Sequence, residues 1–322
     1  MSELHKFIFE GLPVRGMLVR LTGAWKEILK RRADAGGYPP EVLSLLGEMT
    51  AAGALMQSNI KFNGALVLQI FGDGPVKLAV AEVQPDLSLR ATATVTGEVA
   101  SGASLSQLVN VGNEGRCAIT LDPKDKLPGT QPYQGVVPLY GDQREKIESL
   151  AEVLEHYMLQ SEQLDTKLVL AADGEVAAGL LIQRLPVKGE GNLEGTTDRD
   201  ANEDEIGRNE DYKRIAMLAG TLKREELLGL DADTILRRLF WEEKITRFVP
   251  ETPSFACNCS QARVSSMLRS LGVAEIESIL AEQGRVDVGC EFCGAQYGFD
   301  PVDAAQIFTR PEDQLPPTPT VQ

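Results

Sequence analysis

Four cysteines lie close together near the C-terminal end of the chain. Cys257 and Cys259 form a CxC pair, and Cys290 and Cys293 form a CxxC pair after thirty intervening residues. Two such pairs of thiolates, brought together by a folded insert, supply the four corners of a tetrahedral metal site. We therefore expect these side chains to bind one Zn²⁺ ion per chain. Iron is an open alternative, because a tetrahedral site of four sulfurs accepts either metal.

A metal at this site would also make the cysteines reactive. The thiolate is the reactive form of cysteine, and a bound metal holds it deprotonated near neutral pH. An oxidant can convert the ligands to sulfenic acid or disulfide, after which the metal leaves. Because structural zinc contributes on the order of 10 kcal/mol to such small modules, its loss is expected to unfold the module. The four cysteines are thus consistent with a redox switch and also with a static structural zinc site.

The sequence disfavours two other roles for the four cysteines, namely structural disulfides and a zinc ribbon that binds nucleic acid. Structural disulfides need an oxidising compartment, and the N-terminal sequence MSELHKFIFEGLPVRG lacks the unbroken apolar core of a signal peptide. A zinc ribbon that grips nucleic acid needs basic surroundings, whereas residues 251–310 carry eight acidic and four basic side chains. The whole chain has a formal net charge of −15, which repels phosphate backbones. We therefore expect no nucleic-acid partner.

The thirty residues between the two pairs have a pattern that returns the chain to the first pair. Apolar residues recur at helical spacing in two stretches, one ending at Gly272 and the other at Gly284. Residues 285–288 then predict a strand that leads into the second pair. Gly294, directly after that pair, suits a tight turn whose amides point at sulfur. The apolar residues of the two expected helices are Val264, Met267, Leu268, Leu271, Ile276, Ile279 and Leu280.

The N-terminal half predicts an α+β core domain over residues 1–186. Runs of strands interleaved with a few helices are typical of such a domain. Both tryptophans of the chain, Trp25 and Trp241, are expected to be core residues. The expected elements are a helix from Pro40 toward Ile60, a hairpin turning at residues 72–75, a strand within Leu87 to Val99, an amphipathic helix starting near Asp142, and a hairpin turning at Asp173-Gly174.

A change of composition separates this domain from the cysteines. Residues 187–211 include nine acidic, three basic and four apolar residues, too few apolar groups to fold, so a solvated linker is expected. Helical patterns return at Tyr212–Leu228 and Asp231–Lys244, with apolar faces that need packing from flanking domains. We expect a core domain (1–186), an acidic linker with a metastable helical switch region (187–250), a zinc-binding redox-switch module (251–310) and a disordered tail (311–322).

The other side chains that could take part in catalysis do not form a recognisable active-site motif. The chain has two histidines, His5 and His156, which excludes an HExxH metalloprotease and disfavours a Ser-His-Asp hydrolase. Ser58 and Lys61 match an SxxK nucleophile motif, but its companion SDN and KTG motifs are missing. Cys117 is expected to be a small buried residue. No apolar run reaches the roughly 18 residues of a membrane helix, and the N-terminal sequence lacks a signal peptide, so we expect a cytoplasmic protein that is not membrane-bound.

Five segments of the chain resemble one known family. FACNCS and CEFCGAQYGF, with helices between them, resemble the zinc-binding module of the bacterial redox-regulated 33 kDa heat-shock chaperone family (33 kDa chaperonin). The segments GRCAITLDPKD, PYQGVVPL and EELLGLDADTILRRLFWEE resemble that family in the same order. The resemblance therefore covers nearly the whole chain, and the spacing of the cysteines is its most specific part.

The resemblance implies an ATP-independent holdase that catalyses no reaction. When the cysteine motif of the family is matched to this sequence, the resemblance implies that the zinc ligands, which are also the redox thiols, are Cys257, Cys259, Cys290 and Cys293. The resemblance further implies that the reduced, zinc-bound protein is inactive. Oxidation would join Cys257 to Cys259 and Cys290 to Cys293, release zinc, unfold the module and the linker, and favour a homodimer that holds unfolding client proteins. The alternative is a constitutive zinc-ribbon adaptor that docks one folded protein partner.

Overall fold

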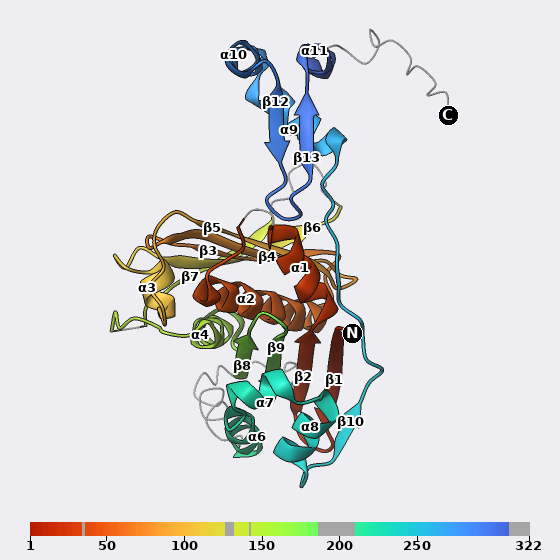
Figure 1. Ribbon diagram of the computed structural model, residues 1–322. Helices are drawn as coiled ribbons and strands as arrows, with labels where there is room; N and C mark the ends of the chain where they lie inside the picture. The colour runs from red at the N-terminus through yellow and green to blue at the C-terminus, as the bar shows by residue number, and fades with distance from the viewer. Residues whose placement is uncertain (34–35, 126–131, 142, 186–209, 309–322) are drawn as a thin grey trace, which may run out of the picture. The chain divides into compact units, whose positions relative to one another are not determined.

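The computed structural model describes residues 1–33, 36–125, 132–141, 143–185 and 210–308 (Figure 1). The chain divides into two compact units, Met1–Ala256 and Cys257–Gln322. The helices expected in the switch region therefore belong to the first unit, and the four clustered cysteines belong to the second. Residues 187–209 of the expected acidic linker and the expected tail at 311–322 lie outside the described residues.

The first unit has runs of two or three strands separated by helices, which confirms the predicted α+β fold class. Its strands are β1 (Glu3–Phe9), β2 (Val14–Leu21), β3 (Gly64–Phe71), β4 (Val76–Val83), β5 (Ser88–Val95), β6 (Arg116–Pro123), β7 (Tyr133–Pro138), β8 (Thr166–Ala172), β9 (Ala177–Arg184), β10 (Ile245–Arg247) and β11 (Ser254–Phe255). Its helices are α1 (Gly23–Ala33), α2 (Pro40–Asn59), α3 (Leu105–Val109), α4 (Leu150–Glu162), α6 (Glu210–Gly220), α7 (Arg224–Gly229) and α8 (Ala232–Phe240).

Two sheets organise the first unit. The five-stranded sheet has the order β10-β1-β2-β9-β8, and the six-stranded sheet has the order β11-β5-β4-β3-β6-β7. Neighbouring strands are antiparallel except β11 and β5, which are parallel. The hairpins predicted at residues 72–75 and at Asp173-Gly174 are confirmed as β3–β4 and β8–β9. The strand predicted within Leu87 to Val99 is β5.

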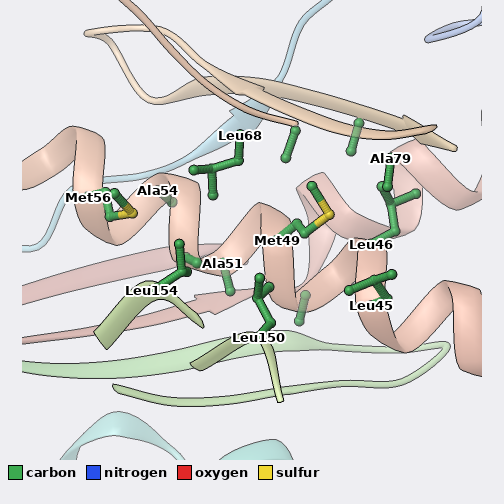
Figure 2. Close-up of a cluster of buried hydrophobic side chains, with 14 of the residues drawn as sticks. Leu45, Leu46, Met49, Ala51, Ala54, Met56, Leu68, Ala79, Leu150 and Leu154 are labelled. Atoms are coloured by element: carbon green, nitrogen blue, oxygen red, sulfur yellow. The ribbon is translucent and has the colours of Figure 1, made fainter. Parts of the chain in front are cut away.

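Helix α2 forms the centre of the main core and lies between the two sheets (Figure 1). Thirteen of its twenty residues are buried, so this helix is apolar nearly all round. Figure 2 shows its side chains beside Leu68 and Ala79 of the six-stranded sheet and beside Leu150 and Leu154 of α4. None of the described helices, α2 included, combines the length and apolar character needed to cross a membrane.

Helices α6, α7 and α8 cover the face of the five-stranded sheet that points away from α2 (Figure 1). Successive strand residues point to opposite faces, so Leu181 of β9 faces α2 while Leu180 and Ile182 face these three helices. We call the buried sheet residues on this side the sheet face: Phe7, Phe9, Val14, Leu18, Ala171, Ala178, Leu180 and Ile182. The helices bury Ile215, Ala219, Leu222, Leu227, Ala232, Ile235, Leu236, Leu239 and Phe240 against it, forming a second core.

The two tryptophans differ in their surroundings. Trp25 is fully buried, as predicted. Trp241 is 73% exposed, so the prediction that it is a core residue was wrong. The reason is its position around the helix axis: the preceding residue, Phe240, turns its ring inward against the sheet face, and adjacent helical residues point about 100° apart.

The second predicted helix of the core domain begins later than expected. It starts at Leu150 rather than near Asp142. Ser149 caps the helix, because its side-chain oxygen accepts the backbone N–H of Glu152 at 3.3 Å. Ile147 has the spacing of a helical residue, but its backbone N–H donates to the carbonyl of Leu139 in a preceding loop. Backbone pairing outside the helix therefore overrides the apolar period here.

Strands β10 and β11 tie the segment before the cysteines to the first unit. β10 pairs with β1, near the start of the chain, and β11 pairs with β5. Only Ala256 separates β11 from Cys257. The chain therefore enters the second unit directly from a strand that is anchored on the six-stranded sheet.

The second unit has a small core of its own. It contains helices α9 (Gln261–Leu271), α10 (Val273–Gln283) and α11 (Pro301–Phe308) and the antiparallel strands β12 (Val286–Gly289) and β13 (Gln296–Phe299). The predicted helices ending at Gly272 and Gly284 and the predicted strand before the second cysteine pair are confirmed. Its buried apolar cluster has six members: Leu268, Ile276, Val286, Phe299, Ala304 and Ile307.

Candidate metal centre

The first cysteine pair lies in the irregular segment between β11 and α9. Cys257 directly follows the anchored end of the first unit, and Cys259 precedes the N-cap of α9. That N-cap is Ser260, whose side-chain oxygen accepts the backbone N–H of Arg263 at 3.3 Å. The sequence thus holds the CxC pair between a paired strand and a capped helix.

The second cysteine pair lies in the turn that joins β12 to β13. The backbone N–H of Cys290 donates to the carbonyl of Ala295, and the N–H of Gly294 donates to the carbonyl of Cys290, both at 2.8 Å. Gly294 has a φ of +72°, in the left-handed region that glycine adopts without strain. These bonds confirm the predicted tight turn and hold Cys290 and Cys293 on one side of it.

The two pairs bring their four sulfur atoms together. All four Sγ atoms lie within 4.8 Å of one another. The Sγ–Sγ distance is 3.7 Å between Cys257 and Cys290 and 3.3 Å between Cys259 and Cys293. A tetrahedral site with Zn–S bonds of about 2.3 Å has sulfur–sulfur edges of about 3.8 Å. Since all four cysteines are free thiols, this donor set fits a metal ion and could hold one.

Hydrogen-bond donors point at the sulfurs of Cys259, Cys290 and Cys293. Backbone N–H groups of the turn point at the sulfurs of Cys290 and Cys293. Cys259 receives a side-chain donor instead, the hydroxyl of Tyr297, at 3.1 Å. Sequence reasoning did not identify Tyr297, and its place four residues after the second pair was the one signal for it. Such donors orient ligand atoms and tune their basicity.

The thiols of the cluster have different pKa values. Burial raises the pKa of Cys293 to about 12 and also raises the pKa of Cys290. For Cys259, burial acts in the same direction, but hydrogen bonds from Tyr297 and the neighbouring thiols outweigh it and lower the pKa to about 7. The hydrogen bonds to Cys259 therefore favour its ionised form. A divalent metal at the centre would hold all four sulfurs as thiolates.

The other residues singled out from the sequence lie outside this cluster. Cys117 is fully buried in β6, as predicted, and burial raises the pKa of its thiol to about 12. Ser58 Oγ donates to the carbonyl of Leu55 at 2.9 Å, which is the bond of a serine at a helix end. His156 is half-buried on α4, far along the chain from the four cysteines. Among the described residues, the metal-ligating group therefore consists of the four cysteines near the C-terminus.

Comparisons with known proteins show similarity over nearly the whole chain. The chain matches the family model described as Hsp33 protein over residues 2–300. It is 48% identical over 307 residues to the 33 kDa chaperonin of Chromobacterium violaceum, covering 95% of this chain and 94% of that relative. It is 44% identical over 309 residues to the 33 kDa chaperonin of Methylobacillus flagellatus, covering 96% and 94%.

A solved structure shares the fold. The crystal structure of the 33 kDa chaperonin from Thermotoga maritima matches with a TM-score of 0.70 and 18% sequence identity, covering 95% of this chain and 98% of that chain. The curated relatives are named as chaperonins, which supports a chaperone function for this chain. The family match and the relatives both extend over nearly the whole chain, and we conclude that the chain belongs to the Hsp33 protein family.

Proposed function

We propose that this protein is a redox-regulated, ATP-independent holdase that binds unfolding proteins and catalyses no reaction. In its reduced state, Cys257, Cys259, Cys290 and Cys293 hold one Zn²⁺, and the protein is inactive. Oxidation joins the cysteines within each pair, zinc leaves, and a homodimer binds clients. The working compartment is the cytoplasm, where thiols stay reduced until an oxidant appears. The observation that carries this proposal is the apolar sheet face beneath three short helices.

The second unit depends on its metal for stability. Its core has six buried apolar side chains, too few to stabilise a module of this size alone. Structural zinc contributes on the order of 10 kcal/mol or more to such modules. Oxidation of the sulfurs removes the ligands, so loss of zinc unfolds the second unit.

The three helices over the sheet face are marginal by themselves. They contain 11, 6 and 9 residues, and isolated helices shorter than about 12 residues are barely stable in water. Two arginines add polar contacts to the sheet and α2. The guanidinium of Arg20 donates to the carbonyls of Leu227 and Leu228, and that of Arg224 lies 3.8 Å from the carboxylate of Glu48. The second core and these few contacts hold the helices in place.

The chain itself couples the second unit to these helices. Strand β11 has two residues, and it lies one residue before Cys257. When the second unit unfolds, β11 becomes the end of the folded part, and chain ends fray with little cost. Fraying past β11 and the three-residue β10 reaches α8 and the second core.

Release of the helices uncovers a client-binding surface. The sheet face presents eight buried apolar or aromatic residues, and the helices expose their own apolar faces at the same time. A large contiguous apolar patch binds other exposed apolar chains. Unfolding proteins have such segments exposed, whereas folded proteins bury them. The surface therefore selects unfolding clients without a nucleotide.

Hydrogen exchange with an aggregation assay tests the proposal. Reduced, zinc-loaded protein is treated with peroxide under mild heat, and light scattering follows aggregation of an unrelated unfolding enzyme. We expect aggregation to be suppressed after oxidation only. Amide protection is expected to fall over residues 210–308 and to persist in β3, β4, β8 and β9. Equal protection of α6–α8 in both redox states, with suppression switched on, would exclude the mechanism. No suppression in either state would favour the adaptor.

Stabilising α7 is expected to delay activation. Gly229 is the last residue of α7, it has no positive φ, and a Cβ there would meet no atom within 4 Å. Replacing glycine by alanine at such a position stabilises by about 0.4–1 kcal/mol. Gly229→Ala is therefore expected to slow activation at a given peroxide dose by roughly two- to fivefold. Gly174→Ala, in the β8–β9 turn with equally free space, is the matched control. Activation of Gly229→Ala at the wild-type rate would contradict the prediction.

A further inference from the structure

The two halves of the metal centre obtain their hydrogen bonds in different ways. The CxxC pair lies in a tight turn whose backbone N–H groups point at the sulfurs of Cys290 and Cys293. The CxC pair lies in an irregular segment between a strand and a helix. Cys259 in that segment receives the hydroxyl of Tyr297, from the opposite half of the site.

Tyr297 is placed to donate a hydrogen bond to the sulfur of Cys259. It lies on β13 opposite Val288 of β12, and its ring packs against the small core of the second unit. This packing fixes the ring, so the hydroxyl is held 3.1 Å from Cys259 Sγ. Removal of the hydroxyl would leave the ring and its packing intact.

We propose that Tyr297 is a positioning residue for Cys259. The hydrogen bond from its hydroxyl slows oxidation of the Cys259 sulfur and so sets the peroxide concentration at which the CxC pair reacts. The inference rests on the function proposed above. A sulfur attacks peroxide with an electron pair, and a hydrogen bond to that pair stabilises the charge on sulfur. The bond weakens as the charge moves to oxygen, so it stabilises the starting state more than the transition state.

Oxidation of the CxC pair by hydrogen peroxide takes two steps. The Cys259 thiolate attacks one oxygen of hydrogen peroxide, an S–O bond forms, the O–O bond breaks, and hydroxide leaves. The Cys257 thiolate then attacks the sulfur of that sulfenic acid, an S–S bond forms, and a second hydroxide leaves. Two electrons pass from the two sulfurs to peroxide, and two protons taken up from the buffer convert the two hydroxides to water. Zinc loses two ligands in the process.

Tyr297→Phe tests the inference. Reduced, zinc-loaded protein is mixed with hydrogen peroxide, a colorimetric chelator follows zinc release, and a sulfenic-acid trap with peptide mapping follows each cysteine. We expect the variant to start with one zinc per chain and to release it about three- to tenfold faster, the range of one hydrogen bond. Trapped sulfenic acid is expected to rise at Cys259 and to stay at the wild-type level at Cys290.

The site-resolved readout separates this role from a merely structural one. A general loosening of the module would raise trapping at all four cysteines alike or lower the zinc content before oxidant is added, and either result overturns the inference. An unchanged rate of zinc release also overturns it. Tyr133→Phe, which removes a hydroxyl from a half-exposed tyrosine in the first unit, is the matched control. Wild-type protein that releases zinc without becoming a holdase would contradict the proposed function instead.

Discussion

Replacing Phe240 by alanine is expected to switch on client binding in the reduced, zinc-bound protein without any oxidant. Phe240 is 2% exposed, and its ring centroid lies 6.2 Å from that of Phe7 and 5.1 Å from that of Phe9. Removing a buried phenylalanine ring costs about 3–5 kcal/mol. Phe240 belongs to the second core and not to the main core around α2, so this cost falls on the docking of α6–α8. The released fraction is expected to rise by a factor on the order of 10²–10³.

The neighbouring residue supplies the control for this experiment. Trp241→Ala removes an even larger side chain from the same part of the helix, but that side chain is 73% exposed. We expect its effect on stability to stay within about 0.5 kcal/mol, as for most surface substitutions. Hydrogen exchange is expected to show lost protection over residues 210–247 in Phe240→Ala and none in β3 or β4. If the helices are released in Phe240→Ala while clients aggregate as before, the sheet face is not the binding surface.

Replacing Cys290 by serine is expected to abolish stoichiometric zinc binding and to unfold the second unit. A hydroxyl is a poor zinc ligand at neutral pH, so the variant keeps three of the four sulfurs that converge within 4.8 Å. Structural zinc contributes on the order of 10 kcal/mol or more, and the six-residue core cannot replace it. Metal analysis is expected to fall from one zinc per chain to well below that value in the presence of a chelator. Amides of residues 257–308 are expected to exchange freely.

Cys117 provides the comparison for that variant. Its thiol is fully buried in β6 of the first unit. Cys117→Ala is expected to keep one zinc per chain, although it leaves a small cavity. X-ray absorption of the wild-type protein is expected to show four sulfurs around zinc. Nitrogen or oxygen in the first shell, iron in protein purified without oxygen, or a full equivalent of zinc in Cys290→Ser would each contradict the predicted site.

The local parts of the second unit could be predicted from the sequence. Its cysteine pairs, the helix ends at Gly272 and Gly284 and the turn at Gly294 depend on residues that are close in sequence. The hairpins β3–β4 and β8–β9 could also be predicted, because the short turn in each joins strands that are adjacent in sequence. A role for Tyr297 could not be predicted from the sequence. Its hydrogen bond to Cys259 joins residues 38 positions apart and depends on how the two cysteine pairs come together in the fold.

The packing around the switch region could not be predicted in this way. The apolar stripes of α6 and α8 indicated that these helices need a partner, but they carry no information on which surface it is. The partner is the sheet face, which includes strand β1 at the opposite end of the chain. The pairings of β10 with β1 and of β11 with β5 are equally distant in sequence. Long-range pairing is decided by the assembled sheet rather than by local period.

The place of the second core in the chain has a consequence for biosynthesis. Phe7 and Phe9 of the sheet face are translated first, whereas β10 and the helices that cover that face lie beyond residue 209. At about 5–20 residues per second, ribosomes need on the order of ten seconds or more to make the intervening chain. During that interval Phe7 and Phe9 lack the helices that cover them in the folded protein, and strand β1 lacks its partner β10. Each new copy therefore passes through a stage in which part of its own chain is apolar and exposed.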